Sequence, residues 1–334
     1  MWQIAGQDKI LALLDYSLKT NNIAHAYLLV GPRHVGKGTL ALNLAQALNC
    51  DGIKPPCGQC RSCRRILENK HADVTSTGLD SRMEIGIDDI RELQHLANLP
   101  PYEGKCKVFI IEDAEYLSTE AANSLLKVLE EPPPKVIWLL LAAEEQRLLP
   151  TVASRCQRLE LKPMSLEQTQ KILANSYNVD LAKAKLLAHL CQGCLGWALS
   201  VLADDNLFQQ RCQTVDKLSS LLIASLEERF AYAQVLATQL SQDRKFVAEV
   251  AKIWLSWWRD LMLIKGNCKE AIINIDYEAV LEKQTRVLSL SEIKGFISRL
   301  SSVQEEISQN VNPRLALESL MLNLPRKSGG FSGS

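Results

Sequence analysis

The chain of 334 residues carries no net charge and contains no long hydrophobic run. Lysine plus arginine and aspartate plus glutamate each number 38, so overall positive charge does not supply an affinity for nucleic acid. A local basic face remains compatible with this balance. The longest apolar run, Val136 to Ala143, is much shorter than the roughly 20 residues that a helix needs to cross a bilayer. We therefore expect a protein that does not cross a membrane.

The residues Met1 to Asp8 lack the apolar core of a secretory signal, which predicts a cytoplasmic protein. In that compartment the 10 cysteines would stay reduced, so disulfides are not expected. The length exceeds what one hydrophobic core usually organises, and we expect two or three domains.

Strand and helix patterns alternate between Ala26 and Leu161, which predicts a parallel sheet with helices on both faces. Beyond Pro163, a capping box at Ser165 to Gln168 opens a region that is helical in pattern almost throughout. We expect strands at 26–30, 107–111 and 136–142, and a helix at 119–131 that Ser118 caps. The expected segments are an α/β P-loop domain at 1–162, a small helical domain at 163–205, a larger helical domain at 206–325 and a flexible tail at 326–334.

A phosphate-binding loop follows the first expected strand. Gly31, Gly36 and Lys37 satisfy the pattern G-x-x-x-x-G-K, and the backbone amides at the start of the next helix would cradle phosphates. Gly38 stands where a magnesium-binding serine or threonine usually follows the lysine, so Thr39 is the candidate metal ligand. The loop predicts a site for ATP with Mg²⁺; the alternative is a loop that keeps its shape without a ligand.

Four cysteines follow that helix with the spacing C-x6-C-x2-C-x2-C, namely Cys50, Cys57, Cys60 and Cys63. Four thiolates suit a tetrahedral Zn²⁺ ion, and the C-x2-C-x2-C part favours a tight knuckle around one ion. Because a site of four thiolates leaves no open position for water, the expected role is structural. The alternative is a set of buried free thiols.

A hydrolysing P-loop protein also needs an acidic pair at the end of a neighbouring strand, to hold Mg²⁺ and to polarise the attacking water. Here the order is Glu112-Asp113, the reverse of the usual Asp-Glu, and Asp113 is one methylene shorter than glutamate. A placement error near 1 Å costs about 10²-fold in rate. The next strand ends in Ala142-Ala143, where a polar side chain usually faces the γ-phosphate. Both departures predict weak or absent hydrolysis.

Several motifs in order resemble the bacterial DNA polymerase III clamp-loader subunits of the AAA+ class. The likeness is dense over residues 4–162 and continues weakly through 193–196. It is carried by His25 to Pro32, Gly86 to Leu93, Ala121 to Pro133 and Leu149 to Cys156, and the cysteine insert falls where that family places zinc. The resemblance implies that the helical segments are an AAA+ lid and an oligomerisation collar.

Within that family the chain resembles the delta-prime type more than the hydrolysing gamma/tau type. The altered pair Glu112-Asp113 and a tryptophan at 197, where active members often place an arginine, fit that type. So does Ser154-Arg155-Cys156, since delta-prime lends such an arginine to its neighbour. The resemblance implies gamma/tau and delta subunits as partners, with the sliding clamp and primed DNA reached through the assembled complex.

Other interpretations stay open at this point. One is a gamma/tau-type motor that hydrolyses ATP. Another is a small-molecule phosphotransferase, suggested by Gly36 to Thr39, although no arginine-rich lid follows the loop. Arg155 can alternatively be a structural residue bonded to local backbone carbonyls. Three of the six tryptophans lie between Lys252 and Met262, where we expect the core of a helical bundle rather than a surface that stacks on DNA.

Overall fold

The computed structural model describes residues 2–79, 82, 84–242, 244–308 and 311–325. They fall into two compact units. The first unit takes in the residues up to 168 together with 193–196, and the second takes in 169–192 together with those from 197 onward. The tail expected at 326–334 lies outside the described residues. The division into three folded domains with boundaries at 162 and 205 stays a prediction.

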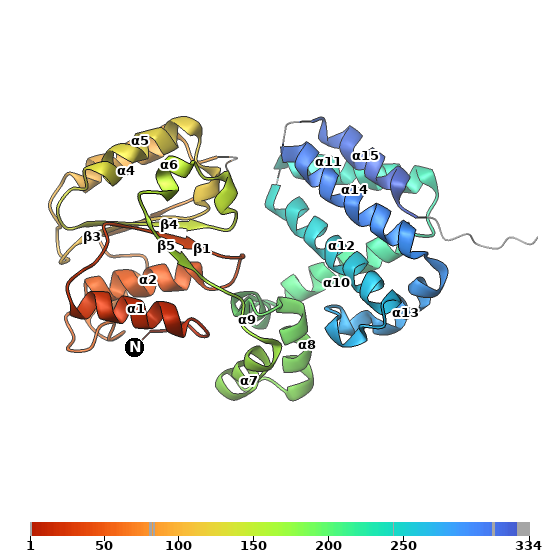
Figure 1. The fold of residues 1–334 in the computed structure, drawn as a ribbon, viewed down its shortest axis with the longest axis horizontal. Helices are drawn as coiled ribbons and strands as arrows, with labels where there is room; N and C mark the ends of the chain where they lie inside the picture. Colours follow the sequence, from red (N-terminus) through yellow and green to blue (C-terminus); the bar gives the residue numbers. More distant parts are fainter. Residues whose placement is uncertain (1, 80–81, 83, 243, 309–310, 326–334) are drawn as a thin grey trace, which may run out of the picture. The chain divides into compact units, whose positions relative to one another are not determined.

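The first unit is built on a five-stranded sheet in which every neighbouring pair of strands is parallel. The strand order is β2-β3-β4-β1-β5 (Figure 1). The strands are β1 (Ala26–Val30), β2 (Val74–Thr77), β3 (Lys107–Ile111), β4 (Val136–Ala142) and β5 (Gln157–Glu160). The three strands expected from the sequence are confirmed with their bounds, and β4 lies at the centre of the sheet between β3 and β1.

Helices cover both faces of this sheet, as expected for a parallel sheet. Side chains of β1 alternate between the faces, so Tyr27 and Leu29 pack in the core beside Leu40 and Leu44 of the helix that follows the P-loop. The opposite face packs against α4, α5 and α6. The helices of this unit are α1 (Asp8–Lys19), α2 (Lys37–Leu48), α3 (Arg61–Leu67), α4 (Ile87–Ala97), α5 (Thr119–Glu130) and α6 (Pro150–Ala153), with 3₁₀ turns η1 (Ala114–Tyr116) and η2 (Glu145–Arg147).

Two helix starts follow the expected capping chemistry. The hydroxyl of Ser118 accepts a hydrogen bond from the backbone N–H of Ala121 at 3.1 Å, which begins α5. That helix ends at Glu130, one residue earlier than expected and just before three prolines. At the start of α7 (Leu166–Tyr177), Ser165 and Gln168 exchange side chain to backbone bonds of 3.2 and 3.3 Å. The predicted capping box is confirmed.

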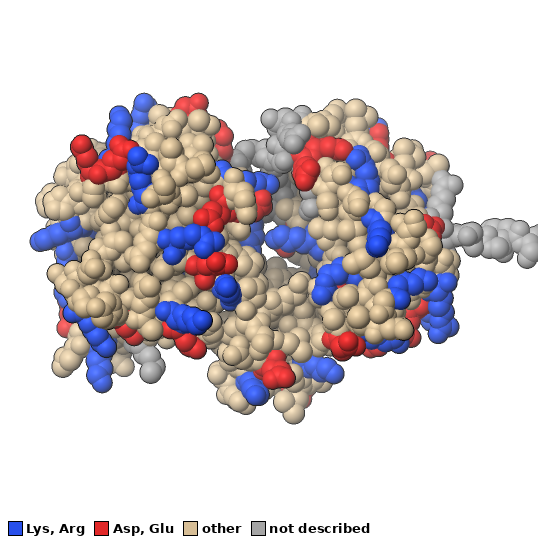
Figure 2. Space-filling view, in the orientation of Figure 1, with Lys and Arg blue, Asp and Glu red and all other residues tan. Residues whose placement is uncertain are grey.

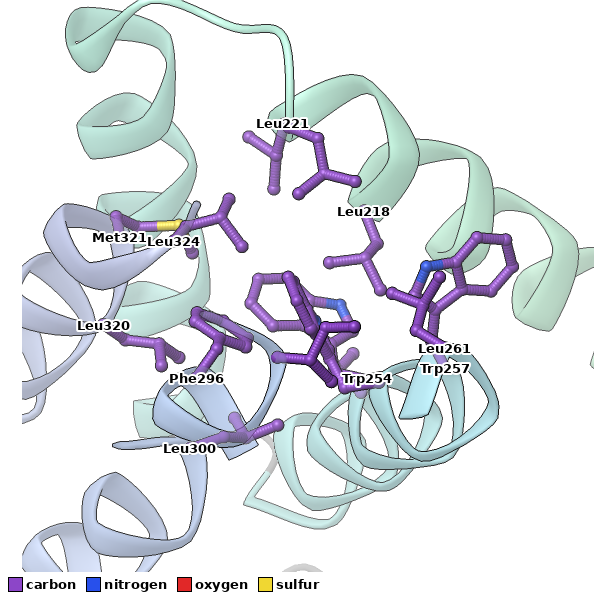
Figure 3. Close-up of a cluster of buried hydrophobic side chains, with 14 of the residues drawn as sticks. Leu218, Leu221, Trp254, Trp257, Leu261, Phe296, Leu300, Leu320, Met321 and Leu324 are labelled. Carbon is purple, nitrogen blue, oxygen red and sulfur yellow. The ribbon is translucent and has the colours of Figure 1, made fainter. Parts of the chain in front are cut away.

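Among the described residues of the second unit, all regular secondary structure is helical. Its core gathers Trp254, Trp257 and Phe296 (Figure 3) together with Trp258. Each of these four residues is at most 1% exposed. The three tryptophans are therefore core residues, as expected, and not an exposed stacking surface. Its elements begin with most of α7, followed by α8 (Leu181–Cys191) and by α9 (Leu195–Ala203) from residue 197 onward. The others are α10 (Asp205–Leu221), α11 (Leu226–Gln242), α12 (Arg244–Lys265), η3 (Lys269–Ala271), η4 (Ile275–Tyr277), α13 (Glu278–Val287), α14 (Leu290–Ser308) and α15 (Pro313–Asn323).

A buried arginine fastens helix ends inside this second unit. Arg229 is fully buried and donates to the backbone carbonyls of Leu221 at 2.9 Å, Leu222 at 3.2 Å and Leu324 at 2.6 Å. These carbonyls lie at the C-terminal ends of α10 and α15, where the last turn of a helix leaves acceptors without partners. The guanidinium thus satisfies several orphan acceptors at once.

The surface carries both signs of charge. Lysine and arginine side chains are interspersed with aspartate and glutamate on the visible face of each unit (Figure 2), in keeping with the zero net charge. Within the part of the chain that the structure describes, no helix combines the length and apolarity needed to span a bilayer.

Candidate functional site

The P-loop lies between β1 and α2, where two glycines allow its backbone path. Gly36 is the N-cap of α2 with φ 107°, a conformation that residues with a side chain rarely adopt. A Cβ on Gly31 would lie 2.5 Å from the carbonyl oxygen of Leu161, so a larger residue does not fit there. Gly38 and Thr39 occupy the first turn of α2, and a Cβ on Gly38 would meet no atom within 4 Å. The sequence thus builds the loop shape that a phosphate site requires.

Lys37 folds back onto its own loop. Its ammonium donates to the carbonyl oxygens of Gly31 at 2.6 Å and Pro32 at 3.0 Å. Burial lowers the pKa of Lys37, and the charge of Glu115 opposes this shift most strongly. The ammonium therefore sits among acceptors that belong to the chain itself.

The two residues of the expected acidic pair point to different places. Asp113 has a left-handed backbone with φ 51°, and its carboxylate lies 3.5 Å from the guanidinium of Arg33 in the P-loop. Glu112 instead accepts a hydrogen bond from the hydroxyl of Ser76 on β2 at 3.1 Å. Asp113 thus faces the P-loop, whereas Glu112 is bonded to the neighbouring strand β2.

Glu115 is a third carboxylate at this edge that the sequence analysis did not single out. It is 7% exposed, and its Oε1 accepts a hydrogen bond from the backbone N–H of Ala143 at 3.1 Å. The turn η1 directs it inward to the end of β4, where Ala142 and Ala143 provide no polar side chain of their own. A glutamate two residues beyond Asp113 is visible in the sequence, but its burial depends on this turn.

The segment 193–196 also packs against the P-loop within the first unit. The backbone N–H of Gly196 donates to the carbonyl of His34 at 3.0 Å, and a Cβ on Gly196 would lie 2.7 Å from that oxygen. At the other end of the segment, Gly193 accepts a bond from the N–H of Met164 at 3.1 Å. The absence of a side chain at 196 permits this close approach to the loop.

The four predicted cysteines come together beyond the C-terminal end of α2. Their sulfur atoms all lie within 4.8 Å of one another, in a metal-binding arrangement. Backbone N–H groups of nearby residues point at the sulfurs, since the N–H of Cys60 lies 3.3 Å from Cys57 Sγ and that of Cys63 lies 3.4 Å from Cys60 Sγ. The N–H groups of Gly52 and Cys57 approach Cys50 Sγ at 3.3 and 3.4 Å.

The surroundings of the sulfur cluster shift the pKa values of two of its thiols in opposite directions. Hydrogen bonds from the backbone N–H groups of Gln59 and Cys60 lower the pKa of Cys57 to about 6. Burial raises the pKa of Cys63 to about 12, and the neighbouring side chains of Cys60 and Cys50 act in the same direction. Four sulfurs around Zn²⁺ at about 2.3 Å would stand about 3.8 Å apart, and Cys57 and Cys63 already lie 4.0 Å apart. The donor set fits a tetrahedral ion after a small contraction.

Arg155 lies on the surface just after α6. Its guanidinium forms an ion pair of 2.7 Å with Glu130 at the end of α5 and donates to the carbonyl of Thr151 at 3.0 Å. The side chain of Arg155 is 36% exposed. The following residue, Cys156, packs against the core, and burial raises the pKa of its thiol to about 12. The Ser-Arg-Cys motif therefore anchors its cysteine inward and presents its arginine outward.

Comparison with known proteins places these features in one family. A family model described as DNA polymerase III, delta subunit, matches residues 6–165. The chain is 30% identical over 330 residues to DNA polymerase III subunit tau of Escherichia coli K12, and the aligned region covers 97% of the chain and 47% of that protein. It is 27% identical over 319 residues to DNA polymerase III subunit delta' of Bacillus subtilis 168, and here the aligned region covers 95% of the chain and 96% of that protein.

Among solved structures, a DNA polymerase III gamma subunit-related protein from Thermotoga maritima aligns with 94% of the chain at 18% identity and a TM-score of 0.48. The chain spans about half the length of the tau relatives that it matches. The parallel sheet with its P-loop and the helical second unit agree with the expected AAA+ fold. The chain belongs to the DNA polymerase III clamp-loader family.

Proposed function

We propose that the chain is a delta-prime-type clamp-loader subunit, which helps to load the sliding clamp onto primed DNA during replication without hydrolysing ATP itself. The observation that carries this proposal is the state of the acidic edge beside the P-loop. Asp113 pairs with Arg33 of the same chain and Glu112 bonds to Ser76, so neither carboxylate stands ready to polarise a water molecule.

The end of β4 supports the same conclusion. Ala142 and Ala143 offer no side-chain donor to a γ-phosphate, so one of the usual contacts to the transferred group is missing. Removing a single preorganised donor from an active site costs about 10²–10³ in rate in well-studied enzymes. Together with the reversed acidic pair, this loss accounts for a very slow or absent hydrolysis.

In this proposal the chain contributes to catalysis through Arg155, which it supplies to the nucleotide of a neighbouring gamma/tau subunit. A guanidinium suits that task because it is planar, permanently charged and able to contact two phosphate oxygens. The exposed position of Arg155 supports the role. If Arg155 were only a structural residue, we would expect it to bond to local carbonyls, as it does to that of Thr151. Its ion pair with Glu130 is exposed, however, and such pairs are weak enough for a phosphate to replace the carboxylate.

A zinc ion held by Cys50, Cys57, Cys60 and Cys63 is the proposed structural cofactor. The short sulfur separations and the N–H groups aimed at the sulfurs support Zn²⁺, which favours four thiolates in a closed tetrahedral site. When bound, the ion would fix the loop between α2 and α3. It would supply no open position for a substrate.

A gamma/tau-type motor is the second candidate, and the loop itself favours it. Gly36, Lys37 and Thr39 keep the elements that bind ATP with Mg²⁺, and the tau relatives match nearly the whole chain. We propose that the loop binds nucleotide passively. The phosphotransferase alternative loses its support, because the chain's relatives are polymerase III subunits.

The deciding experiment combines assembly with turnover. The purified chain is mixed with gamma/tau and delta subunits, separated by size exclusion, and ATP hydrolysis is measured for the chain alone and for the complex. We expect co-elution, no turnover by the chain alone, and nearly normal clamp loading by a complex that carries Lys37→Ala. Steady-state turnover by the isolated chain that Lys37→Ala abolishes would establish the motor instead.

A further inference from the structure

Glu115 is a buried carboxylate to which the proposed function assigns no role. Its Oε1 accepts a hydrogen bond from the N–H of Ala143 at 3.1 Å. Its Oε2 is buried and, among the described residues, has no hydrogen-bond partner. An ionised oxygen in this position is unfavourable unless a cation lies close enough to compensate it. A positive charge near the end of β4 would compensate this oxygen.

The cation that the backbone framework brings to this place is Lys37. Its ammonium donates to the carbonyl of Gly31 at 2.6 Å, and the N–H of Gly31 donates to the carbonyl of Ala142 at 3.2 Å. The next N–H along the chain, that of Ala143, is the donor to Glu115. These bonds place the ammonium at the end of β1 and the carboxylate at the adjacent end of β4, with the Gly31 to Ala142 bond joining the two strand ends.

Among the charged groups around Lys37, Glu115 is the best candidate for its counter-ion. Asp113 and Cys194 also favour the charged ammonium, whereas Arg33 opposes it, and Glu115 has the largest electrostatic influence of the four. The carboxylate of Asp113 is shared with the guanidinium of Arg33 at 3.5 Å. Glu115 has no such competing ion pair within the described residues, so its charge is available to Lys37.

We propose that Glu115 is a positioning residue that serves as the counter-ion of Lys37 when no nucleotide is bound, and that nucleotide phosphates displace it from this role. The proposal rests on the proposed nucleotide site. A lysine that is already neutralised and held on loop carbonyls must give up these interactions before it contacts phosphate. Glu115 therefore lowers the affinity of the site for nucleotide, while it stabilises the ligand-free loop.

The first test measures the affinity of the full-length chain for ATP with Mg²⁺ by calorimetry. Glu115→Gln keeps the shape and the bond from Ala143 but removes the charge, and we expect the Kd to fall about three- to tenfold. In a Lys37→Met background the same substitution is expected to change the Kd less than twofold. Glu144→Gln, which removes an exposed carboxylate beside Ala143, is the matched control and should also change the Kd less than twofold.

The second test needs no nucleotide. The Tm values of the wild type, Glu115→Gln, Lys37→Met and the double variant form a cycle. Because each single variant leaves the other charge without its partner, we expect the double variant to lose less Tm than the sum of the single losses. If the Tm loss of the double variant equals the sum of the two single losses, Glu115 is not the counter-ion of Lys37. An unchanged or raised Kd for Glu115→Gln, or no ATP binding by either protein, would overturn displacement by nucleotide, and the last result would also remove the nucleotide site.

Discussion

The two candidate sites of the first unit lie at opposite ends of α2 and are built in different ways. At the N-terminal end, Gly36 and Lys37 begin the helix and form the P-loop. Beyond the C-terminal end, Cys50 begins the sulfur cluster, whose other members follow in the next turns of chain. In the cluster, the N–H groups that approach the sulfurs come from residues two to seven positions along the chain. At the P-loop, the facing charges come from distant segments.

This difference explains why one site is visible in the sequence and the other only in part. The spacing C-x2-C sets the sulfur geometry because the local chain turn supplies both the ligand and its hydrogen-bond donor. The character of the P-loop instead depends on which remote carboxylate faces Lys37 and Arg33. Such pairs follow from the packing of β1, β3 and β4, which local spacing does not encode.

The largest effect is expected when the cysteine cluster is disrupted. Cys60→Ser should remove one of four thiolates and release Zn²⁺, because structural zinc contributes on the order of 10 kcal/mol to the folding of the module that it holds. Metal analysis after gel filtration under reducing conditions should fall from one zinc per chain to a small fraction. Hydrogen exchange should increase at residues 50–70, while the parallel sheet stays protected.

Cys268→Ser is the matched control for that experiment, because Cys268 is exposed and lies outside the cluster. It should keep a full equivalent of zinc. A wild-type protein that contains no zinc when purified with reductant would contradict the metal assignment, and the cysteines would then be free thiols.

The fold was predictable where residue patterns are strong. The strands β1, β3 and β4 are buried on both faces and apolar or nearly so, which makes them visible as short branched runs. The edge strands β2 and β5 were missed. Val74–Thr77 is only half buried, and Gln157–Glu160 exposes three of its four residues. Their polar side chains resemble a loop, and only pairing with β3 and β1 makes them strands.

The sequence singles out candidate site residues, but it does not reveal which of their side chains pair with one another. The sequence singled out Lys37 and Asp113, yet Asp113 engages Arg33. Glu115 was overlooked because its importance comes from burial and from the N–H of Ala143, two properties of the folded sheet. The contact of Arg155 with the end of α5 is likewise tertiary.

The next largest effect tests the arginine that the chain is proposed to supply in trans. In a reconstituted loader, Arg155→Ala should slow single-turnover ATP hydrolysis at one interface by about 10²-fold or more, since such arginines contribute about 10³–10⁵ in other phosphoryl-transfer systems. Assembly should survive, because the side chain is exposed and makes weak local contacts. Arg155→Lys should restore little, since an ammonium lacks the two-pronged geometry.

Arg158→Ala provides the control for charge and position. Arg158 is exposed on β5 and pairs with Glu145 and Glu160 of the same chain. Its loss should leave hydrolysis within about twofold of the wild type. Wild-type hydrolysis and loading by the Arg155→Ala complex would refute the role in trans and leave Arg155 as a structural residue.

The smallest effect is expected when the P-loop is given the magnesium-binding hydroxyl that its sequence lacks at Gly38. A Cβ at Gly38 meets no atom within 4 Å, so Gly38→Ser introduces the hydroxyl that usually binds Mg²⁺ after the loop lysine without disturbing its neighbours. We expect a gain of several-fold in ATP affinity that appears only with Mg²⁺. Gly38→Ala separates this gain from helix stabilisation of about 0.5–1 kcal/mol, which needs no metal. Hydrolysis should stay undetectable in both variants, because Asp113 still pairs with Arg33 and the end of β4 is unchanged.

If Gly38→Ser and Gly38→Ala bind ATP equally with and without Mg²⁺, the loop does not place a metal at this position. If Gly38→Ser begins to hydrolyse ATP, the missing hydroxyl and not the distant carboxylates limits the site, and local sequence governs the P-loop as fully as it governs the cysteine cluster.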